Sequence, residues 1–538
     1  MGFNKQLSKW VINSNIQSKP SRPYPFSTYS EIAAPGTMVQ RNDRCFFMPD
    51  LKNPDAWEVN NYTSWESLKD KTYNNRLLPV AKEEHQQTLP PISKVIDAFI
   101  RNGKPMEPCH RTSLLFMGFA QWFTDAFFRI DFKDLRKNTS NHEIDLCQLY
   151  GLNKTTTNAL RSHKGGTLFS QIIKGKEFPP YLFDENLEVK SAFKELEYIS
   201  YLPTVYRELW KDDAKKRKFY ATGLGRGNST VSHSTINTLF LRLHNKIARQ
   251  LEKEYNWGDE QIFQTTRNIL IVILIKVVVE DYVNHLKPFK WMKFELDTTY
   301  APKKNWYRNN WISTEFNLLY RWHSMIPDHM QFNGKVYATK DVFRFNNQFV
   351  EENSITSILE QLSYQKAGKM TLMNTPDFMK EAELMTLFIS RASKLTSYAD
   401  YCEQFSGSMT KFFNARPKKM SDITKDKDQL SILNSLYDGD VEKVDLVIGA
   451  LAQDPPKNPL YEEKPILGNL MLQMIASDAF SHALTNPLLS ENVFNEQTFS
   501  PLGWKLIQQF SSVKSIVDFT EETHSAVNFN YNKVSQKL

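Results

Sequence analysis

A tyrosine, an arginine, a tryptophan and a histidine follow one another in the stretch "EFNLLYRWHSMIPDH", Glu315 to His329. Tyr320 and His323 are three residues apart, and the apolar residues around them recur at helical spacing. We therefore expect both side chains on one face of a helix that Pro327 closes. A buried imidazole needs a hydrogen-bond partner or a metal ion. The pair indicates either a structural core histidine or a metal ligand with an oxidisable phenol beside it.

A second stretch, "LLFMGFAQWFTDAFF" from Leu114 to Phe128, is apolar on every side except at Gln121 and Asp125. These two residues are four apart, so they share one face of a helix. Polar side chains on a buried helix need partners, because burying them alone costs free energy. Two interpretations remain at this point: the pair forms the polar wall of a binding site, or it caps another helix in the core.

The elements that would position these residues are helices. Apolar residues recur every three or four positions in most of the chain after residue 60, and alternating strand patterns are nearly absent. The run "ILIVILIKVVV", Ile269 to Val279, is too short for a bilayer and predicts a core helix that is apolar on all sides. It belongs to a longer segment, 258–286, that predicts one helix or two end to end. The sequence predicts a mostly α fold with little β, in one large domain over 61–538.

Residues 1–60 are rich in Pro, Ser and Asn and predict an arm over the surface, with one short helix near its start. Lys5 and Lys9 share one side of that helix. The apolar side holds Phe3, Leu7, Trp10 and Val11. Such a helix could lie on a membrane, as a remnant of a membrane-binding segment, or dock on the protein's own core.

Composition excludes several classes of protein. The 538 residues are 41% hydrophobic and 13% aromatic, which is enough for a large core and argues against disorder. A net charge of +7 is small for this length. It argues against a nucleic-acid binder and is compatible with weak attraction to an anionic membrane. The four cysteines share no CxxC spacing, and the N-terminus has no apolar signal segment, so we expect a reducing, cytoplasmic location.

Other motifs carry little chemistry. "GLGRGN", Gly223 to Asn228, does not follow a predicted strand, so it is interpreted as a turn rather than a nucleotide loop. No HExxH, GxSxG or Walker motif occurs. Nothing in the sequence positions a hydrolytic triad.

Taken together, several stretches resemble the animal haem peroxidase superfamily, and within it the cyclooxygenases. The resemblance covers roughly Tyr62 to the C-terminus, in the same order as in that family. Within that family the chain is most similar to the soluble cyclooxygenases of red algae, which also lack a signal peptide. The stretches are "YTSWESLKDKTYNNRLLPV", "LLFMGFAQWFTDAFFRID", "TLFLRLHNKIARQLEKEYNWGDEQIFQTTRNILI", "VVVEDYVNHL" and "EFNLLYRWHSMIPD".

The resemblance implies a haem b cofactor and a role for five residues. His323 stands where the family has the axial ligand of the haem iron, and Trp322 matches the family's tryptophan between tyrosine and histidine. Tyr320 matches the tyrosine that becomes a radical and takes a hydrogen atom from the fatty acid. Tyr282 matches the tyrosine that hydrogen-bonds the radical tyrosine. Gln121 matches the glutamine on the peroxide side of the haem.

The chain departs from the family at the position of the distal histidine, which is Asp125 here. A carboxylate, with a pKa near 3.9, is a weaker base than an imidazole with a pKa near 6.5. Burial would raise the pKa of Asp125 and make it a better base. We expect reduced peroxidase turnover and retained oxygenation, because a radical has to be generated only occasionally.

Substrate-binding residues are also carried over from the resemblance. Phe289 stands where the family has a tyrosine at the channel constriction. Arg22 is the candidate for the carboxylate-binding arginine, and Ser481 falls near the serine that aspirin acetylates.

The expected function is a cyclooxygenase that converts arachidonate and O2 to a prostaglandin endoperoxide, as a homodimer. The alternatives are a linoleate-type or α-dioxygenase that releases a hydroperoxide, and a haem-binding protein without catalysis. A plain peroxidase is disfavoured by Asp125.

Overall fold

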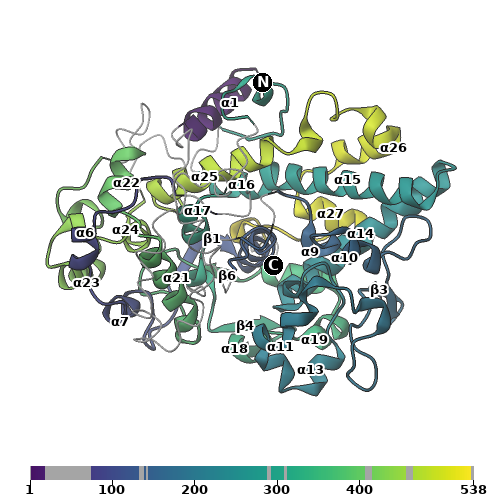
Figure 1. The fold of residues 1–538 in the computed structure, drawn as a ribbon, viewed down its shortest axis with the longest axis horizontal. Helices are drawn as coiled ribbons and strands as arrows, with labels where there is room; N and C mark the ends of the chain where they lie inside the picture. The colour runs from purple at the N-terminus through teal and green to yellow at the C-terminus, as the bar shows by residue number, and fades with distance from the viewer. Residues whose placement is uncertain are drawn as a thin grey trace, which may run out of the picture.

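Helices make up more than half of the described residues, as the hydrophobic spacing predicts (Figure 1). The computed structural model describes residues 2–17, 74, 76–131, 138–140, 143–287, 292–307, 312–405, 415–455 and 464–534. These residues share one continuous hydrophobic core, in agreement with the predicted single, mostly α domain. The helices of nine residues or more are α1 Gly2–Gln17, α8 Leu114–Thr124, α14 Val231–Glu254, α15 Asp259–Val277, α20 Ile355–Ser363, α21 Lys380–Ala392, α23 Lys427–Tyr437, α25 Asn469–Leu484, α26 Glu496–Gln509 and α27 Val513–Glu521.

Short elements connect these helices. In the described part of the chain, three small antiparallel sheets pair β1 Pro108–Ser113 with β6 Lys366–Gly368, β2 Gln171–Ile173 with β3 Lys176–Phe178, and β4 His329–Phe332 with β5 Lys335–Ala338. The shorter α-helices are α6 Glu83–Thr88, α7 Ile92–Val95, α9 Cys147–Tyr150, α10 Lys154–Leu160, α11 Leu202–Val205, α12 Arg207–Trp210, α13 Asp213–Arg217, α16 Val283–Leu286, α17 Thr314–Leu319, α18 Thr339–Val342, α19 Asn347–Glu352, α22 Tyr398–Gln404, α24 Leu446–Ala452 and α28 Tyr531–Val534.

The helix α14 packs against both α15 and α8. Its N-cap is Thr230, whose hydroxyl accepts a hydrogen bond from the backbone N–H of His233. Where α8 crosses α14, a Cβ added at Gly118 would lie 2.6 Å from the hydroxyl of Ser232. The absence of a side chain at Gly118 therefore allows the two helices to approach closely.

The segment 259–286 is helical throughout, because α15 continues through a π turn, Val278–Tyr282, into α16. Within the described residues it alone is long and apolar enough to cross a membrane, with a mean hydropathy of 1.8. However, 72% of its most apolar stretch is buried inside the protein, in agreement with the predicted core helix. The π turn carries Tyr282 and shifts the face that follows it, as such turns often do at functional sites.

The predicted helix through Tyr320 and His323 is wrong in one respect. The helix α17 ends at Leu319, and Tyr320 already has non-helical angles (φ −90°, ψ 10°). The indole Nε1 of Trp322 donates to the carbonyl oxygen of Leu319 at 2.9 Å, and so satisfies one carbonyl at the end of the helix. A separate 3₁₀ turn, His323–Met325, follows. Tyr320 and His323 therefore do not share a helix face.

The helix α1 docks on the protein itself, against α25 (Figure 1). Among the residues of α1 whose burial the structure describes, Ser8, Ile12 and Ile16 are buried, whereas Trp10 is 42% exposed, so the predicted apolar face is wrong at Trp10. Lys5 and Lys9 form ion pairs with Asp297. The rest of the predicted arm, residues 18–60, lies outside the described residues.

Glu315 is a fully buried carboxyl group in the first turn of α17. Its Oε1 accepts hydrogen bonds from the backbone N–H of Leu77 and from the hydroxyl of Tyr401. Burial raises the pKa of Glu315 to about 7, although these two hydrogen bonds oppose the rise. The group thus ties α17 to α22 and to the segment before α6.

We predict that Glu315→Gln makes stability less dependent on pH. Because the pKa of Glu315 is raised in the folded state, its contribution is fully present below pH 4.5 and is lost as the pH rises through about 7. The loss at pH 8 amounts to about 3 kcal/mol. The variant should therefore gain in thermal unfolding midpoint, relative to the natural protein, between pH 5 and pH 8.

Glu84→Gln, at an exposed position of α6, is the matched control. A difference between Glu315→Gln and the natural protein that stays constant across this pH range would contradict the prediction.

Candidate active site

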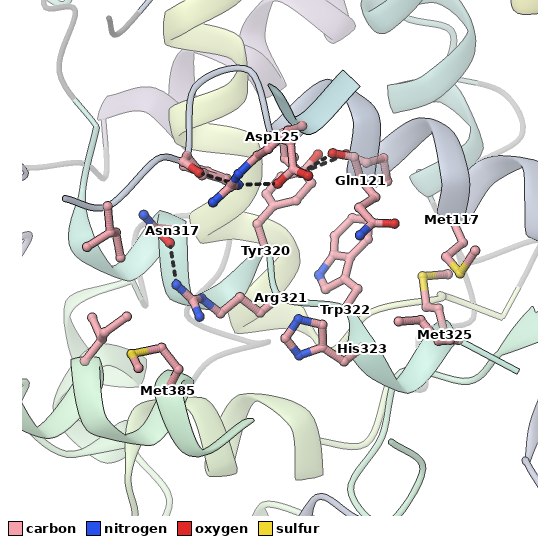
Figure 2. A pocket seen from close by; sticks show the side chains of 17 residues that line it. Met117, Gln121, Asp125, Asn317, Tyr320, Arg321, Trp322, His323, Met325 and Met385 are labelled. Atoms are coloured by element: carbon pink, nitrogen blue, oxygen red, sulfur yellow. Dashed lines mark hydrogen bonds and ion pairs between the residues drawn. The ribbon is translucent and has the colours of Figure 1, made fainter. Parts of the chain in front are cut away.

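A cavity of about 260 Å³ opens between α8, α21 and the chain that follows α17 (Figure 2). It is lined by Met117 and Gln121 from α8, by Asp125 at the C-cap of that helix, and by Met385 and Ile389 from α21. The segment Tyr320–His323 forms the floor between these helices. The two polar residues of the buried helix thus face the same cavity as the predicted metal ligand.

His323 points into this cavity, with 20% of its side chain exposed (Figure 2). Its Nδ1 lies 3.1 Å from Oε1 of Glu383 on α21. In the described part of the chain, no group of three or more His, Cys, Asp or Glu side chains could hold a bare metal ion. A single axial imidazole is nevertheless sufficient where a porphyrin supplies the other ligands of the iron.

Tyr320 and Tyr282 form a hydrogen bond between their hydroxyl groups at 2.9 Å. Burial raises the pKa of both phenols, so both stay protonated at neutral pH. Tyr320 stacks on Trp322, with 4.5 Å between the ring centroids and 16° between the planes. The hydrogen bond that the resemblance implies for Tyr282 is therefore present. Trp322 lies beside the phenol of Tyr320 and precedes His323 in the chain.

Asp125 is held as an anion at the wall opposite His323. Its Oδ1 accepts a hydrogen bond from Arg226 at 2.7 Å, and its Oδ2 lies 3.0 Å from Nε2 of His233. Burial alone would raise the pKa of Asp125, but the charge of Arg226 and the contact with His233 outweigh it and bring the pKa to about 2. The expected net rise in the pKa of Asp125 is therefore wrong, and Asp125 is an even weaker base than a free carboxylate.

Three residues of this site were not predicted: Arg226, which lines the cavity, His233, which contacts Asp125, and Glu383, which contacts His323. Arg226 belongs to a short 3₁₀ turn, Gly225–Asn228, inside the motif that was interpreted only as a turn. The signal that could have found it is a charged side chain in a glycine-rich turn with apolar surroundings. His233 and Glu383 gave no such signal, because each follows the ordinary period of a helix.

A second pocket lies on the other side of Tyr320. It is lined mainly by aromatic and aliphatic side chains, with Glu143 and His482 as its polar members. Tyr320 is the only described residue that lines both this pocket and the cavity of His323. The apolar pocket holds about 20 Å³, so an alkyl chain could enter only if side chains such as Phe127 and Phe316 move.

The predicted substrate residues have different outcomes. Ser481 lies on α25, is buried, and donates its hydroxyl hydrogen bond to the carbonyl oxygen of Asp478 in its own helix at 2.9 Å. It lines neither pocket, whereas its neighbour His482 does. Arg22 and Phe289 lie outside the described residues.

Arg321 supplies a cation at the cavity. Its Nη2 donates to Oδ1 of Asn317 at 3.3 Å, and no carboxylate forms an ion pair with it within the described ranges. Burial lowers the pKa of Arg321 to about 10, although the negative charge of Glu383 opposes this. A lone imidazole, apolar walls and a cation without an anionic partner are features that fit a haem, whose carboxylates need a positive partner.

Comparisons with known proteins agree with this site. The animal haem peroxidase family matches residues 132–530. Prostaglandin G/H synthase 2 of Bos taurus is 28% identical over 481 residues, which are 87% of this chain and 74% of that protein. Prostaglandin G/H synthase 1 of Mus musculus is 28% identical over 486 residues, 88% of this chain and 74% of that protein.

Two solved structures share the fold. A fatty acid alpha-dioxygenase of Arabidopsis thaliana has a TM-score of 0.64 at 14% identity and covers 86% of this chain and 80% of its own. Peroxidase A from Dictyostelium discoideum has a TM-score of 0.63 at 17% identity and covers 86% of this chain and 95% of its own. The matched residues include Tyr282, Tyr320, His323 and Glu383, and the chain belongs to the animal haem peroxidase family, whose members bind haem.

Proposed function

We propose that this protein is a haem-dependent fatty acid oxygenase of the cyclooxygenase type, which converts arachidonate and O2 to a prostaglandin endoperoxide. The observation that carries the proposal is the place of Tyr320, which forms the wall between the cavity of His323 and an apolar pocket. The prostaglandin G/H synthases that the chain resembles support the choice of substrate. Homodimer formation and contact with a membrane surface remain proposals by the same analogy.

Four residues of this site have a part in the proposed mechanism: His323, Arg321, Tyr320 and Tyr282. His323 would hold the iron of haem b, and Arg321 would hold a haem carboxylate. Haem b supplies, when bound, an oxidant strong enough to take an electron from a phenol. With haem b bound, Tyr320 would give up an electron together with its hydroxyl proton. Tyr282 would keep the phenol oxygen oriented through their hydrogen bond.

The oxidised Tyr320 then acts on the fatty acid. It takes one hydrogen atom from a bis-allylic carbon, which restores the phenol and leaves a carbon radical to which O2 adds. The aromatic walls around the apolar pocket exclude water and orient the alkyl chain. The protein contributes positioning, and the cofactor contributes the oxidation.

A second candidate is an α-dioxygenase, which would act on the carbon next to the carboxyl group. The observation that favours it is the presence of His482 and Glu143 in the pocket beside Tyr320, where a substrate carboxyl group could lie. The fold that the chain shares with fatty acid alpha-dioxygenases is compatible with it.

Product analysis separates the candidates. Haem-reconstituted protein is given arachidonate, linoleate or palmitate, oxygen uptake is recorded, and products are identified by mass spectrometry. A cyclooxygenase forms cyclic products from arachidonate and leaves palmitate unchanged, because palmitate has no bis-allylic carbon. Oxidation of palmitate supports the α-dioxygenase. A haem absorption band without oxygen uptake on any acid indicates haem binding without catalysis.

We predict that His323→Ala abolishes stoichiometric haem binding. Within the described residues, His323 is the only histidine that lines the cavity. Binding is measured by titrating haem into the apoprotein and recording the Soret absorption. His329→Ala, at an exposed position of β4, is the matched control and should bind one haem per chain. Full binding by His323→Ala would show that the ligand lies elsewhere.

We predict that Tyr320→Phe abolishes oxygen uptake on the fatty acid and leaves haem binding unchanged, because only the phenol oxygen is lost. Tyr337→Phe on β5, a partly buried tyrosine outside both pockets, is the control. Product formation by Tyr320→Phe at the natural rate would contradict the assignment of the radical to this residue.

We predict that Asp125→His increases peroxidase turnover. A positioned imidazole accepts the peroxide proton far better than a carboxylate whose pKa is about 2. A rise of roughly 10²-fold is the lower end of what a general base contributes. Turnover is measured with a hydroperoxide and guaiacol.

Asp125→Asn, which breaks the ion pair with Arg226 and adds no base, should show no such increase. If the natural protein reduces hydroperoxide as fast as it oxygenates arachidonate, Asp125 does not limit peroxidase turnover.

A further inference from the structure

We propose that Glu383 is the positioning residue of the axial imidazole: its carboxylate accepts the Nδ1–H of His323 and gives the imidazole anionic character. The inference rests on the proposed role of His323 as iron ligand and assigns its partner. Glu383 lies on α21, 60 residues after His323 in the chain, and only the fold brings the two side chains together.

The carboxylate is fixed in place before any cofactor binds. Glu383 is only 2% exposed, and its Oε1, which lies 3.1 Å from Nδ1 of His323, also accepts a hydrogen bond from the hydroxyl of Thr375 at 2.9 Å. The backbone of Thr375 is itself held, because its N–H donates to Phe99 and its carbonyl oxygen accepts from Arg101. The position of Glu383 is thus set by the segment around Thr375 and does not depend on His323.

Two buried polar atoms remain unsatisfied at this contact. Neither Nδ1 of His323 nor Oε2 of Glu383 has a hydrogen-bond partner, although the first lies within reach of the carboxylate. Buried polar groups of native proteins are nearly always paired, so an orphaned donor beside an orphaned acceptor points to a contact that tightens in the functional state. A small rotation of the imidazole would align Nδ1–H with the carboxylate.

The charges around Glu383 also support a hydrogen bond between its carboxylate and His323. No lysine or arginine in the described ranges forms an ion pair with Glu383, and Arg321 acts on it only from a distance. A carboxylate without a close cation is costly to bury. The positive charge of a ferric haem, transmitted through the imidazole of His323, would compensate it.

The consequence concerns both the tautomer and the iron. A proton held on Nδ1 by Glu383 leaves the lone pair of Nε2 free to bind iron in the cavity. An anionic acceptor makes the imidazole a stronger electron donor, which stabilises the ferric state against the ferrous state. A merely structural carboxylate, bonded only to Thr375, would change neither property.

The test replaces Glu383 by glutamine, which keeps the size of the side chain and removes its charge. In the haem-loaded Glu383→Gln variant we expect a more positive Fe(III)/Fe(II) reduction potential by spectroelectrochemistry. We also expect a lower iron–histidine stretching frequency in the ferrous resonance Raman spectrum, and haem affinity should fall by roughly 10- to 100-fold. Glu381→Gln, at an exposed position on the same helix, is the matched control and should leave all three unchanged.

Each outcome either supports or overturns the proposed role of Glu383. A Glu383→Gln variant that binds haem with unaltered potential and stretching frequency overturns the proposal. If that variant fails to fold, Glu383→Asp replaces it, because aspartate keeps the charge but is one methylene shorter. We then expect smaller shifts of the reduction potential and of the stretching frequency in the same directions. Unchanged values in Glu383→Asp would also overturn the proposal. None of these readouts needs a fatty acid, and full haem binding by His323→Ala would instead refute the role of His323 itself.

Discussion

The site depends on one hydrogen bond, from the indole of Trp322 to the carbonyl oxygen of Leu319. It satisfies the end of α17 and lets the chain leave the helix between Leu319 and His323. As a result, Tyr320 faces Tyr282 on the π turn, and His323 faces Glu383 on α21. A continuous helix would have directed both side chains to one wall, and the phenol would not have separated the cavity from the apolar pocket.

The two carboxylates near the cavity have different electrostatic surroundings. On the wall of α8, the carboxylate of Asp125 is neutralised by Arg226 and contacts His233, so it binds protons weakly. On the wall of α21, the carboxylate of Glu383 has no such cation and lies next to the imidazole. The first arrangement makes Asp125 a poor proton acceptor. If His323 holds a haem iron, as we propose, the second would make its imidazole a stronger electron donor.

Much of the fold could be predicted from the sequence, because the period of apolar residues reports directly which helix faces are buried. A buried helix in Leu114–Phe128 and the helical segment 258–286 were predicted, and α8 and the continuous helix 259–286 are present there. The helix through Tyr320 and His323 was predicted with the wrong geometry, since the period of the apolar residues continues past the break. The face of α1 was wrong at Trp10, because only contact with α25 decides which side of that helix is buried.

What the sequence by itself determined is the set of chemical groups and their local order: a phenol, an indole and an imidazole within four residues, and a glutamine and an aspartate one helical turn apart. The tertiary structure alone decided the partners of these groups, since Arg226, His233 and Glu383 lie 101, 108 and 60 positions from Asp125 and His323 along the chain. The physical reason is that a pKa or a hydrogen bond depends on distances of a few ångströms. Only the packing of α8, α14 and α21 sets those distances.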